Sequence, residues 1–416
     1  ASLLIFSCSK KNIHINTSII PKPVSQTINN GAFNLAEKIE IIYESSFVNE
    51  VEYLKSNFPI NEGSNQNFIR IEKNSLLKEE EYKLVIRTNE VIINASTPRG
   101  AMHAIQSLRQ LLPNEINQHQ KNIPIKCMEI HDYPKFKWRG LLLDCCRHFM
   151  EKEFVKKYID LLAYHKMNIL HWHLTEDQGW RIAIEKYPNL TEIGAWRKDE
   201  NGSIYGGFYN KQDIQEIIEY ASKRHIEIIP EIELPGHSVA AIASYPYLSC
   251  TGKKIDVETD WGVFKDIYCA GNDSVFTFLE DVLSEVTELF PSKYVHIGGD
   301  EAPKYRWENC KKCQNRIKEN KLKDEHELQS YFINRIGKFL EKKGKKIIGW
   351  DEIIEGGIPH NAVIQSWRGI EGGLTAANNK HYAIMSPTSH CYFDYDLEAI
   401  NLEKVYSFNP IPTSLD

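Results

Sequence analysis

Short apolar runs alternate with amphipathic segments through most of the chain after residue 130. Each run is brief, continuous and bounded by polar residues or glycine, which is typical of a buried strand. Between the runs, apolar residues recur at helical spacing, as at Ile214, Ile217, Ile218 and Ala221. The predicted strands cover residues 138–144, 168–174, 226–232, 294–298, 346–350, 362–367 and 382–386. Strands that alternate with helices predict a parallel sheet.

The position of the polar residues favours one kind of parallel sheet. Polar side chains follow the apolar stretch of one predicted strand after another, as at Asp144, Glu231 and Asp300. This pattern is typical of a (β/α)8 TIM barrel, whose active site lies at the carboxyl ends of its strands. Because only seven strands are legible, we expect an α/β barrel over residues 126–416 whose last βα unit is missing from the sequence.

The region before the barrel has a different pattern. Residues 81–85 and 91–94 read as strands, and Thr97 and Pro98 are typical of the capping residue and first residue of a helix. Residues 21–125 are therefore predicted to form a small α+β domain.

The first twenty residues predict an export signal remnant and a tether. An apolar run ends at Phe6, Ser7 and Cys8 and is followed by lysines, which resembles the end of a bacterial lipoprotein signal with Cys8 as the acylated residue. No other segment approaches the about 20 apolar residues of a membrane span. We expect an exported bacterial lipoprotein, periplasmic or at the cell surface, that meets the membrane only through a lipid anchor at Cys8.

The net charge and the cysteine content indicate which partners and metals the protein could bind. The net charge of −6 gives no electrostatic reason to expect nucleic acid. Cys310 and Cys313 form a CxxC motif, but no second CxxC or histidine pair accompanies it, and a zinc site needs four ligands. A local disulfide or free thiols is the favoured interpretation, and Cys250 and Cys269 could also pair. The sequence therefore predicts no metal and no cofactor.

The strongest chemical signal is the segment from His296 to Glu301, HIGGDE. An apolar strand runs into two glycines, which allow close backbone approach, and then into two adjacent carboxylates. Neighbouring negative charges push their pKa values apart, so that one carboxyl can act as an acid while the other stays ionised.

This motif and others resemble glycoside hydrolase family 20, the β-N-acetylhexosaminidases. The resemblance covers residues from about 130 to the end in order, and the region before it resembles the α+β domain that usually precedes this barrel. The matching segments are 139–144 with Arg147, His148 and Phe149; 168–180; Pro230 and Glu231 with Pro235, Gly236 and His237; 349–352; and 365–368.

The resemblance implies an exo-β-N-acetylhexosaminidase that removes terminal N-acetylglucosamine or N-acetylgalactosamine with retention. The substrate's acetamido oxygen attacks the anomeric carbon and forms an oxazolinium intermediate. Glu301 matches the general acid, and Asp300 matches the residue that orients the acetamido group. The other substrate-binding positions that it implies are Arg147, Asp177, His237, Trp350, Trp367, Tyr392 and Asp394. Glu233 stands where many relatives carry Asp.

Two other functions fit parts of the pattern. His171 and His173, with His237 and the acid pair, could hold a metal in an amidohydrolase. A lipid-anchored glycan-binding protein without turnover would keep the same pocket. A structural alternative also exists for Arg147, which could form a salt bridge with Asp144 or Glu352 at the mouth of the barrel.

Overall fold

The computed structural model describes residues 15–63, 66–113, 122–199, 201–396 and 398–413. The chain divides into two compact units. Unit 1 comprises residues 1–139, 157–168 and 222–226, and unit 2 comprises residues 140–156, 169–221 and 227–416. Within the described ranges, every helix is too short or too polar to cross a bilayer.

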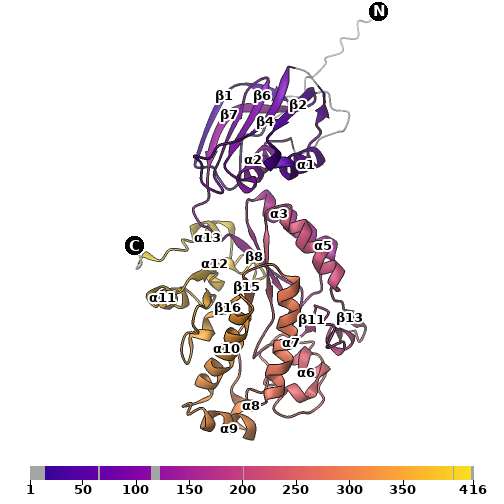
Figure 1. The fold of residues 1–416 in the computed structure, drawn as a ribbon, viewed down its shortest axis with the longest axis vertical. Helices are drawn as coiled ribbons and strands as arrows, with labels where there is room; N and C mark the ends of the chain where they lie inside the picture. Colours follow the sequence, from indigo (N-terminus) through magenta and orange to yellow (C-terminus); the bar gives the residue numbers. More distant parts are fainter. Residues whose placement is uncertain (1–14, 64–65, 114–121, 200, 397, 414–416) are drawn as a thin grey trace, which may run out of the picture. The chain divides into compact units, whose positions relative to one another are not determined.

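Unit 1 is a mixed sheet covered by helices. Its order is β1-β7-β5-β6-β4-β2-β3, and α2 packs against β5 and β6 (Figure 1). The core is apolar and includes Phe33, Ile69, Leu84 and Ile105. The predicted cap of α2 is confirmed. The side chain of Thr97 accepts a hydrogen bond from the Gly100 amide, and Pro98 is the first residue of the helix. The elements are β1 Ser25–Asn34, β2 Lys38–Tyr43, α1 Val48–Asn57, β3 Asn61–Glu62, β4 Asn67–Lys73, β5 Tyr82–Ile86, β6 Glu90–Ala95, α2 Pro98–Gln110 and β7 Pro124–Asp132.

Two expected boundaries differ from the structure. The division placed at residues 125 and 126 falls inside β7, which pairs with β1 and β5, so the sheet of unit 1 continues to Asp132. Part of the expected tether is also docked. Ile19 is buried, and the amide of Ile20 donates to the side chain of Gln110 at 2.7 Å. The tether was expected because residues 9–20 are polar and lack periodicity, and the boundary was placed too early because β7, a strand of nine residues, was not assigned from the sequence. Cys8 lies outside the described residues.

Unit 2 contains the seven predicted parallel strands. Their order, β18-β17-β16-β15-β14-β9-β8, follows the chain without reversal, as in a (β/α)8 barrel. A doubly wound sheet would reverse direction at a switch point. No eighth strand joins this sheet in the part of the chain that the structure describes. The strands are β8 Gly140–Asp144, β9 Ile169–His173, β14 Glu227–Glu231, β15 Tyr294–His296, β16 Lys346–Trp350, β17 Val363–Ser366 and β18 Ala383–Met385.

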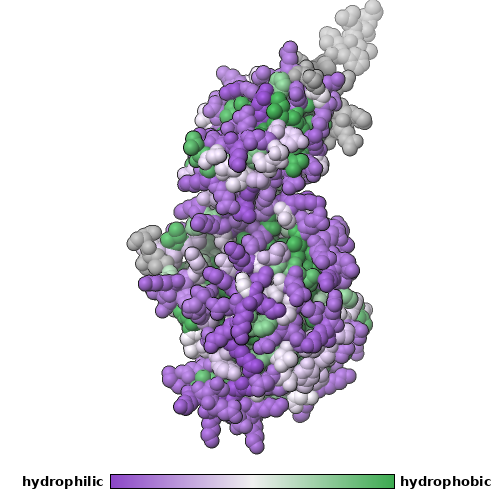
Figure 2. Space-filling model, viewed as in Figure 1, coloured by the Kyte–Doolittle hydropathy of each residue, from purple (hydrophilic) through white to green (hydrophobic). Residues whose placement is uncertain are grey.

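Amphipathic helices follow these strands. The apolar stripe of α7 buries Val275, Leu279 and Val282, and α10 packs beside α7 (Figure 1). Polar side chains cover most of the outer face visible in Figure 2. The helices in unit 2 with at least eight residues are α3 Lys152–Tyr164, of which residues 157–164 belong to unit 1, α5 Lys211–Ser222, α7 Asp273–Leu289, α9 Lys311–Glu319, α10 Glu325–Lys342 and α11 Glu371–Asn378.

The pairing register places the polar residues at one edge of the sheet. Asp144 on β8 lies opposite His173 on β9, which lies opposite Glu231 on β14, which lies opposite His296 on β15. Because all these strands are parallel, their carboxyl ends and the loops that follow meet at the same edge. The segments that follow these strand ends carry the candidate site.

Candidate active site

The acid pair follows β15 on a segment of unusual backbone. Gly298 and Gly299 have positive φ angles of 64° and 95°, and Glu301 has a φ of 41°. A left-handed conformation disfavours a residue with a Cβ, and such strain concentrates at functional positions. The side chain of Asp300 is 15% exposed and that of Glu301 is 38% exposed. The two acids therefore lie in different surroundings although they are adjacent in sequence.

A buried histidine contacts both acids. His237 Nε2 lies 3.4 Å from Asp300 Oδ2 and 3.5 Å from Glu301 Oε2. On its other side, His237 Nδ1 donates to Asp177 Oδ2 at 3.0 Å and lies 2.6 Å from Glu176 Oε1. Burial disfavours the imidazolium, but Glu176 and Asp300 outweigh burial and raise the pKa of His237 well above its ordinary value. His237 is therefore a cation between two groups of carboxylates.

The pKa values of the two acids behind His237 shift in opposite directions. Burial opposes ionisation of Glu176, but His237 and Arg147 hold the pKa of this carboxyl well below its ordinary value. Burial raises the pKa of Asp177 to about 6. Asp177 also accepts a hydrogen bond from the Val239 amide. The predicted pair of Asp177 and His237 is thus brought together. Glu176, which no signal in the sequence distinguished from Asp177, is a second acid in contact with His237.

Arg147 contacts Glu176, the buried acid beside His237. Its guanidinium contacts Asp144 Oδ2 at 2.8 Å and Glu176 Oε2 at 3.0 Å. The salt bridge with Asp144, one of the two alternatives for this arginine, is present. A fully buried Arg181 fixes the loop, because it donates to the carbonyls of Cys145 and Cys146, which immediately precede Arg147. The guanidinium of Arg147 is held in one orientation while its side chain stays 24% exposed.

A second buried carboxylate, Glu231, joins three strands. Its side chain is 0% exposed and lies 2.7–2.8 Å from ring nitrogens of His171, His173 and His296. It also accepts a hydrogen bond from Trp350 Nε1 at 2.9 Å. Burial opposes the imidazolium form of His173, but Glu231 outweighs it and raises the pKa of His173 to about 10. Burial instead lowers the pKa of His171 to about 4.

The distances around Glu231 do not suit a metal centre. Two ligands at about 2.0–2.2 Å from a tetrahedral zinc ion lie about 3.4 Å apart. The imidazole nitrogens of His171, His173 and His296 approach the Glu231 carboxylate more closely than this. The histidines that suggested an amidohydrolase therefore form the buried shell of one carboxylate, which fixes the orientation of Trp350.

Two tryptophans meet beside the acid pair. The ring centroids of Trp350 and Trp367 lie 6.4 Å apart, and Tyr392 stacks on Trp367 at 6.2 Å. Trp367 Nε1 donates to Glu352 at 2.9 Å. Trp367, Glu352 and Glu301 line a cleft of about 530 Å³. Trp350 is buried, so Trp367 presents the larger exposed face.

The two remaining predicted residues, Tyr392 and Asp394, differ in their surroundings. Tyr392 is half-buried, and burial together with the charge of Asp300 raises the pKa of its hydroxyl well above the ordinary value. Asp394 is exposed, and within the described residues it forms no hydrogen bond or ion pair. The structure therefore places Tyr392 near Asp300 and leaves Asp394 at the surface.

Glu233 packs directly beneath the glycine segment. It is buried, and burial, with a further contribution from Asp300, raises its pKa well above the ordinary value. A Cβ at Gly298 would overlap the carboxyl group of Glu233. The sequence singled out Glu233 only as a longer acid than relatives carry. In the structure its carboxyl group occupies the space that a side chain at Gly298 would need.

The sheet order and the acid pair at the carboxyl ends of its strands define a (β/α)8-type barrel, and comparison with known proteins identifies the family. Residues 136–414 match the model of the glycosyl hydrolase family 20 catalytic domain, and residues 16–133 match that of domain 2 of the same family. The chain belongs to glycoside hydrolase family 20.

Relatives and solved structures agree with this family. The chain is 42% identical to a β-hexosaminidase from Porphyromonas gingivalis over 99% of its own length and 58% of the relative's. A family 20 exo-β-N-acetylglucosaminidase from Vibrio harveyi, solved with N-acetylglucosamine, superposes with a TM-score of 0.86 at 32% identity, covering 94% of this chain and 66% of that one. A β-N-acetylhexosaminidase from Bacteroides fragilis gives a TM-score of 0.84 at 34% identity, with coverage of 95% and 82%. The chain thus spans about three fifths of the P. gingivalis relative.

We predict that Gly298→Ala destabilises unit 2 more than Gly344→Ala. Both glycines have positive φ, but a Cβ at Gly344 meets open space. The left-handed backbone costs each variant about 1–2 kcal/mol, and overpacking against Glu233 adds about 1–3 kcal/mol at Gly298 alone. Denaturant unfolding followed by tryptophan fluorescence measures the difference. Adding Glu233→Asp should recover part of the Gly298→Ala loss, and equal destabilisation by the two glycine variants would contradict the overlap.

A second prediction concerns Glu352, whose burial raises its pKa to about 8. Between the ordinary value near 4.5 and about 8, the folded state holds this proton and the unfolded state does not. The contribution of Glu352 to stability is therefore complete below 4.5 and is lost as pH rises through 8. Glu352→Gln should reduce the fall in melting temperature over this range. Glu355→Gln is the control for loss of an acid from the same cleft, and identical pH slopes for wild type and Glu352→Gln would reject the assignment.

Proposed function

We propose that this protein is an exo-β-N-acetylhexosaminidase that hydrolyses terminal N-acetylglucosamine or N-acetylgalactosamine from glycans. The observation that carries the proposal is the adjacent acid pair after β15, with Glu301 lining an open cleft and Asp300 held against the cationic His237. Membership of family 20 supports the same activity. An intact acid pair also favours hydrolysis over glycan binding without turnover.

In this mechanism Glu301 is the general acid and base. Its exposed carboxyl protonates the leaving glycosidic oxygen and, in the second half, removes a proton from the attacking water. Asp300, the less exposed acid, orients the acetamido N–H and stabilises the positive charge that develops on the oxazolinium. His237 lies between them and keeps the two acids at fixed positions.

The arrangement of acids supports the substrate as the nucleophile. A retaining glycosidase with a protein nucleophile needs a second free carboxylate about 5–5.5 Å from the acid. Glu231 and Glu176 are fully buried, and their carboxylates contact histidines and, for Glu176, Arg147. Glu352 accepts a hydrogen bond from Trp367 and has a pKa of about 8, so it is protonated near neutral pH. The acetamido oxygen then supplies the attack.

Other residues complete the proposed −1 subsite. Arg147 binds ring hydroxyls of the terminal sugar with its fixed guanidinium, and closes the pocket so that only chain ends enter. Trp350 and Trp367 pack around the acetamido methyl and the sugar face. Tyr392 donates to the acetamido oxygen. Asp177 holds His237, and Asp394, exposed here, is the weakest member of the predicted set.

Lipid anchoring at Cys8 and export remain predictions of the sequence. Metabolic labelling with a radioactive fatty acid tests the anchor, and the label should be lost in Cys8→Ala.

We predict that Glu301→Gln lowers kcat of the full-length polypeptide on natural glycans by roughly 10²–10⁴-fold. The loss should be much smaller on aryl glycosides with good leaving groups, because these need little protonation. Hydrolysis rates for a leaving-group series measure the effect, and Glu355→Gln from the same cleft is the matched control. Equal losses across the series would remove Glu301 as the acid.

Substrate assistance makes a separate prediction. A thiazoline analogue of the N-acetyl sugar resembles the cyclised intermediate and should inhibit far more strongly than free N-acetylglucosamine. Asp300→Asn should weaken thiazoline binding more than it weakens binding of the free sugar. Inhibition constants for both ligands test the idea, which fails if the thiazoline binds no better than the sugar.

A further inference from the structure

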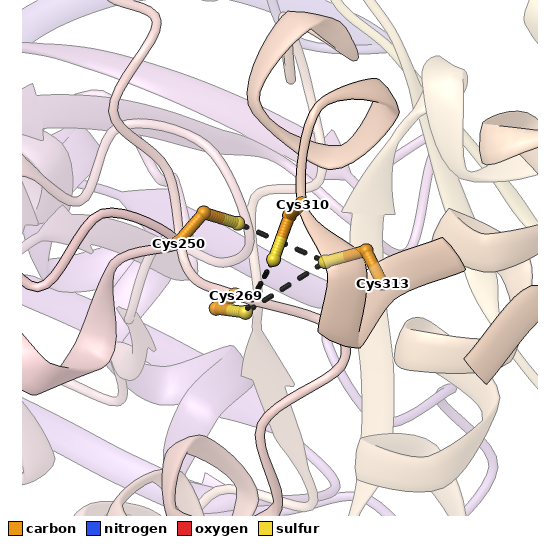
Figure 3. A group of neighbouring side chains, drawn as sticks. All are labelled: Cys250, Cys269, Cys310 and Cys313. Carbon is orange, nitrogen blue, oxygen red and sulfur yellow. Dashed lines mark hydrogen bonds between the residues drawn. The ribbon is translucent and has the colours of Figure 1, made fainter. Parts of the chain in front are cut away.

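Four cysteines from two distant parts of the chain converge in unit 2. Cys250 follows the short helix α6 (Val239–Ser244), Cys269 precedes α7, and Cys310 and Cys313 stand at the start of α9. Figure 3 shows their sulfur atoms pointing toward one shared centre. All four lie within 4.8 Å of one another, and all but Cys250 are buried.

The sulfur separations match a tetrahedral thiolate site. Cys250 and Cys269 each lie 3.7 Å from Cys313, and Cys269 lies 3.8 Å from Cys310. Four sulfurs at about 2.3 Å from a tetrahedral Zn²⁺ lie about 3.8 Å from one another. A disulfide instead needs its sulfurs at about 2.05 Å. Cys269 is nearly equidistant from two partners, which suits a common centre better than one bonded pair.

We propose that Cys250, Cys269, Cys310 and Cys313 bind a structural Zn²⁺ ion. The four thiols release their protons to solvent and coordinate the ion as thiolates, with no position left for water or substrate. This proposal departs from the expectation of no metal, which rested on a single visible CxxC. Cys269 lies 41 positions before Cys310, and Cys250 and Cys269 are themselves far apart in the sequence. Their spacing therefore does not resemble a zinc-binding motif.

The ion would fasten two segments, one of which contains the acid pair. The loop between β14 and α7 carries Cys250 and Cys269, and the loop between β15 and α10 carries the other two. These loops already touch, since Trp307 Nε1 donates to the Tyr268 carbonyl at 2.9 Å and Arg306 pairs with Asp266. A Cβ at Gly271 would overlap the backbone of Lys312, so the approach is close.

The same loops reach the acid pair. The amide of Tyr268, next to Cys269, donates to the Pro235 carbonyl at 3.0 Å, two residues before His237. A Cβ at Gly236 would lie 2.9 Å from the Asp300 carbonyl. The zinc site therefore stabilises the segments that hold His237 and Asp300, and its role is positional, without contact with substrate.

Metal content of the purified full chain tests the proposal. Preparations made without added metal or chelator should contain about one zinc per chain by elemental mass spectrometry. Titration with a mercurial reagent should release that zinc as the four thiols react, which requires no variant to fold. Intact mass under denaturing, non-reducing conditions should show these cysteines unoxidised. A zinc-free native protein, or a mass lowered by two hydrogens for each disulfide among the four, would overturn the site.

Variants separate the site from other cysteines. Cys310→Ser and Cys269→Ser should lose most of the zinc and lower the melting temperature, whereas Cys127→Ser, a buried cysteine of unit 1, should retain it. Replacement by Co²⁺ should give the visible absorption of tetrahedral cobalt thiolate in wild type and not in Cys310→Ser. Full zinc content in both cluster variants would also reject the proposal. Because these readouts do not involve glycosidase activity, they stand or fail independently of the proposed function.

Discussion

The site depends on keeping carboxylates ionised inside the barrel. Burying a charge without a partner costs far more than one interaction returns, so each buried anion must be matched by cations or donors. Glu231 collects three imidazoles and an indole N–H, and Glu176 collects His237 and Arg147. This matching fixes the ends of β9, β14 and β15 relative to one another. The placement of Asp300 and Glu301 beside His237 depends on the buried carboxylates on the other side of this imidazole.

The need to match each buried charge also explains why Glu176 and Asp177 lie on one side of His237 and the acid pair on the other. His237 is held by Glu176 and Asp177 from one side and faces the acid pair from the other. A neutral imidazole in the same place would leave Asp300 without its nearest cation. The electrostatic arrangement at the acid pair therefore exists before any ligand binds, which is how preorganised sites stabilise developing charge.

Much of the architecture could be predicted from the sequence because the periodicity is strong. Seven short apolar runs gave all seven parallel strands, and the helical spacing in residues 214–221 predicted the buried face of α5. Residues 15–20 and β7 were misassigned because their signals are local and weak. The docking of Ile19 depends on Gln110, ninety residues later, and no pattern near either residue indicates it.

Site residues that belong to a sequence motif could be predicted. Site residues that come together only in the folded chain could not. Asp300, Glu301 and His237 stand in short, recognisable segments. Glu176 became distinct from Asp177 only through its contact with Arg147. The four cysteines illustrate the same limit, since one CxxC is visible and its partners come from another loop. Long-range convergence leaves no trace in linear spacing.

At Glu301 the backbone is left-handed, so the residue that suits folding differs from the residue that suits the chemistry. Glycine or asparagine would accept the torsion readily yet lack an acid of the right reach, and a branched residue such as valine would satisfy neither. Tolerance at position 301 in a saturation library would therefore rank differently for folding and for chemistry. Folding yield would favour small or amide side chains, while turnover would single out glutamate.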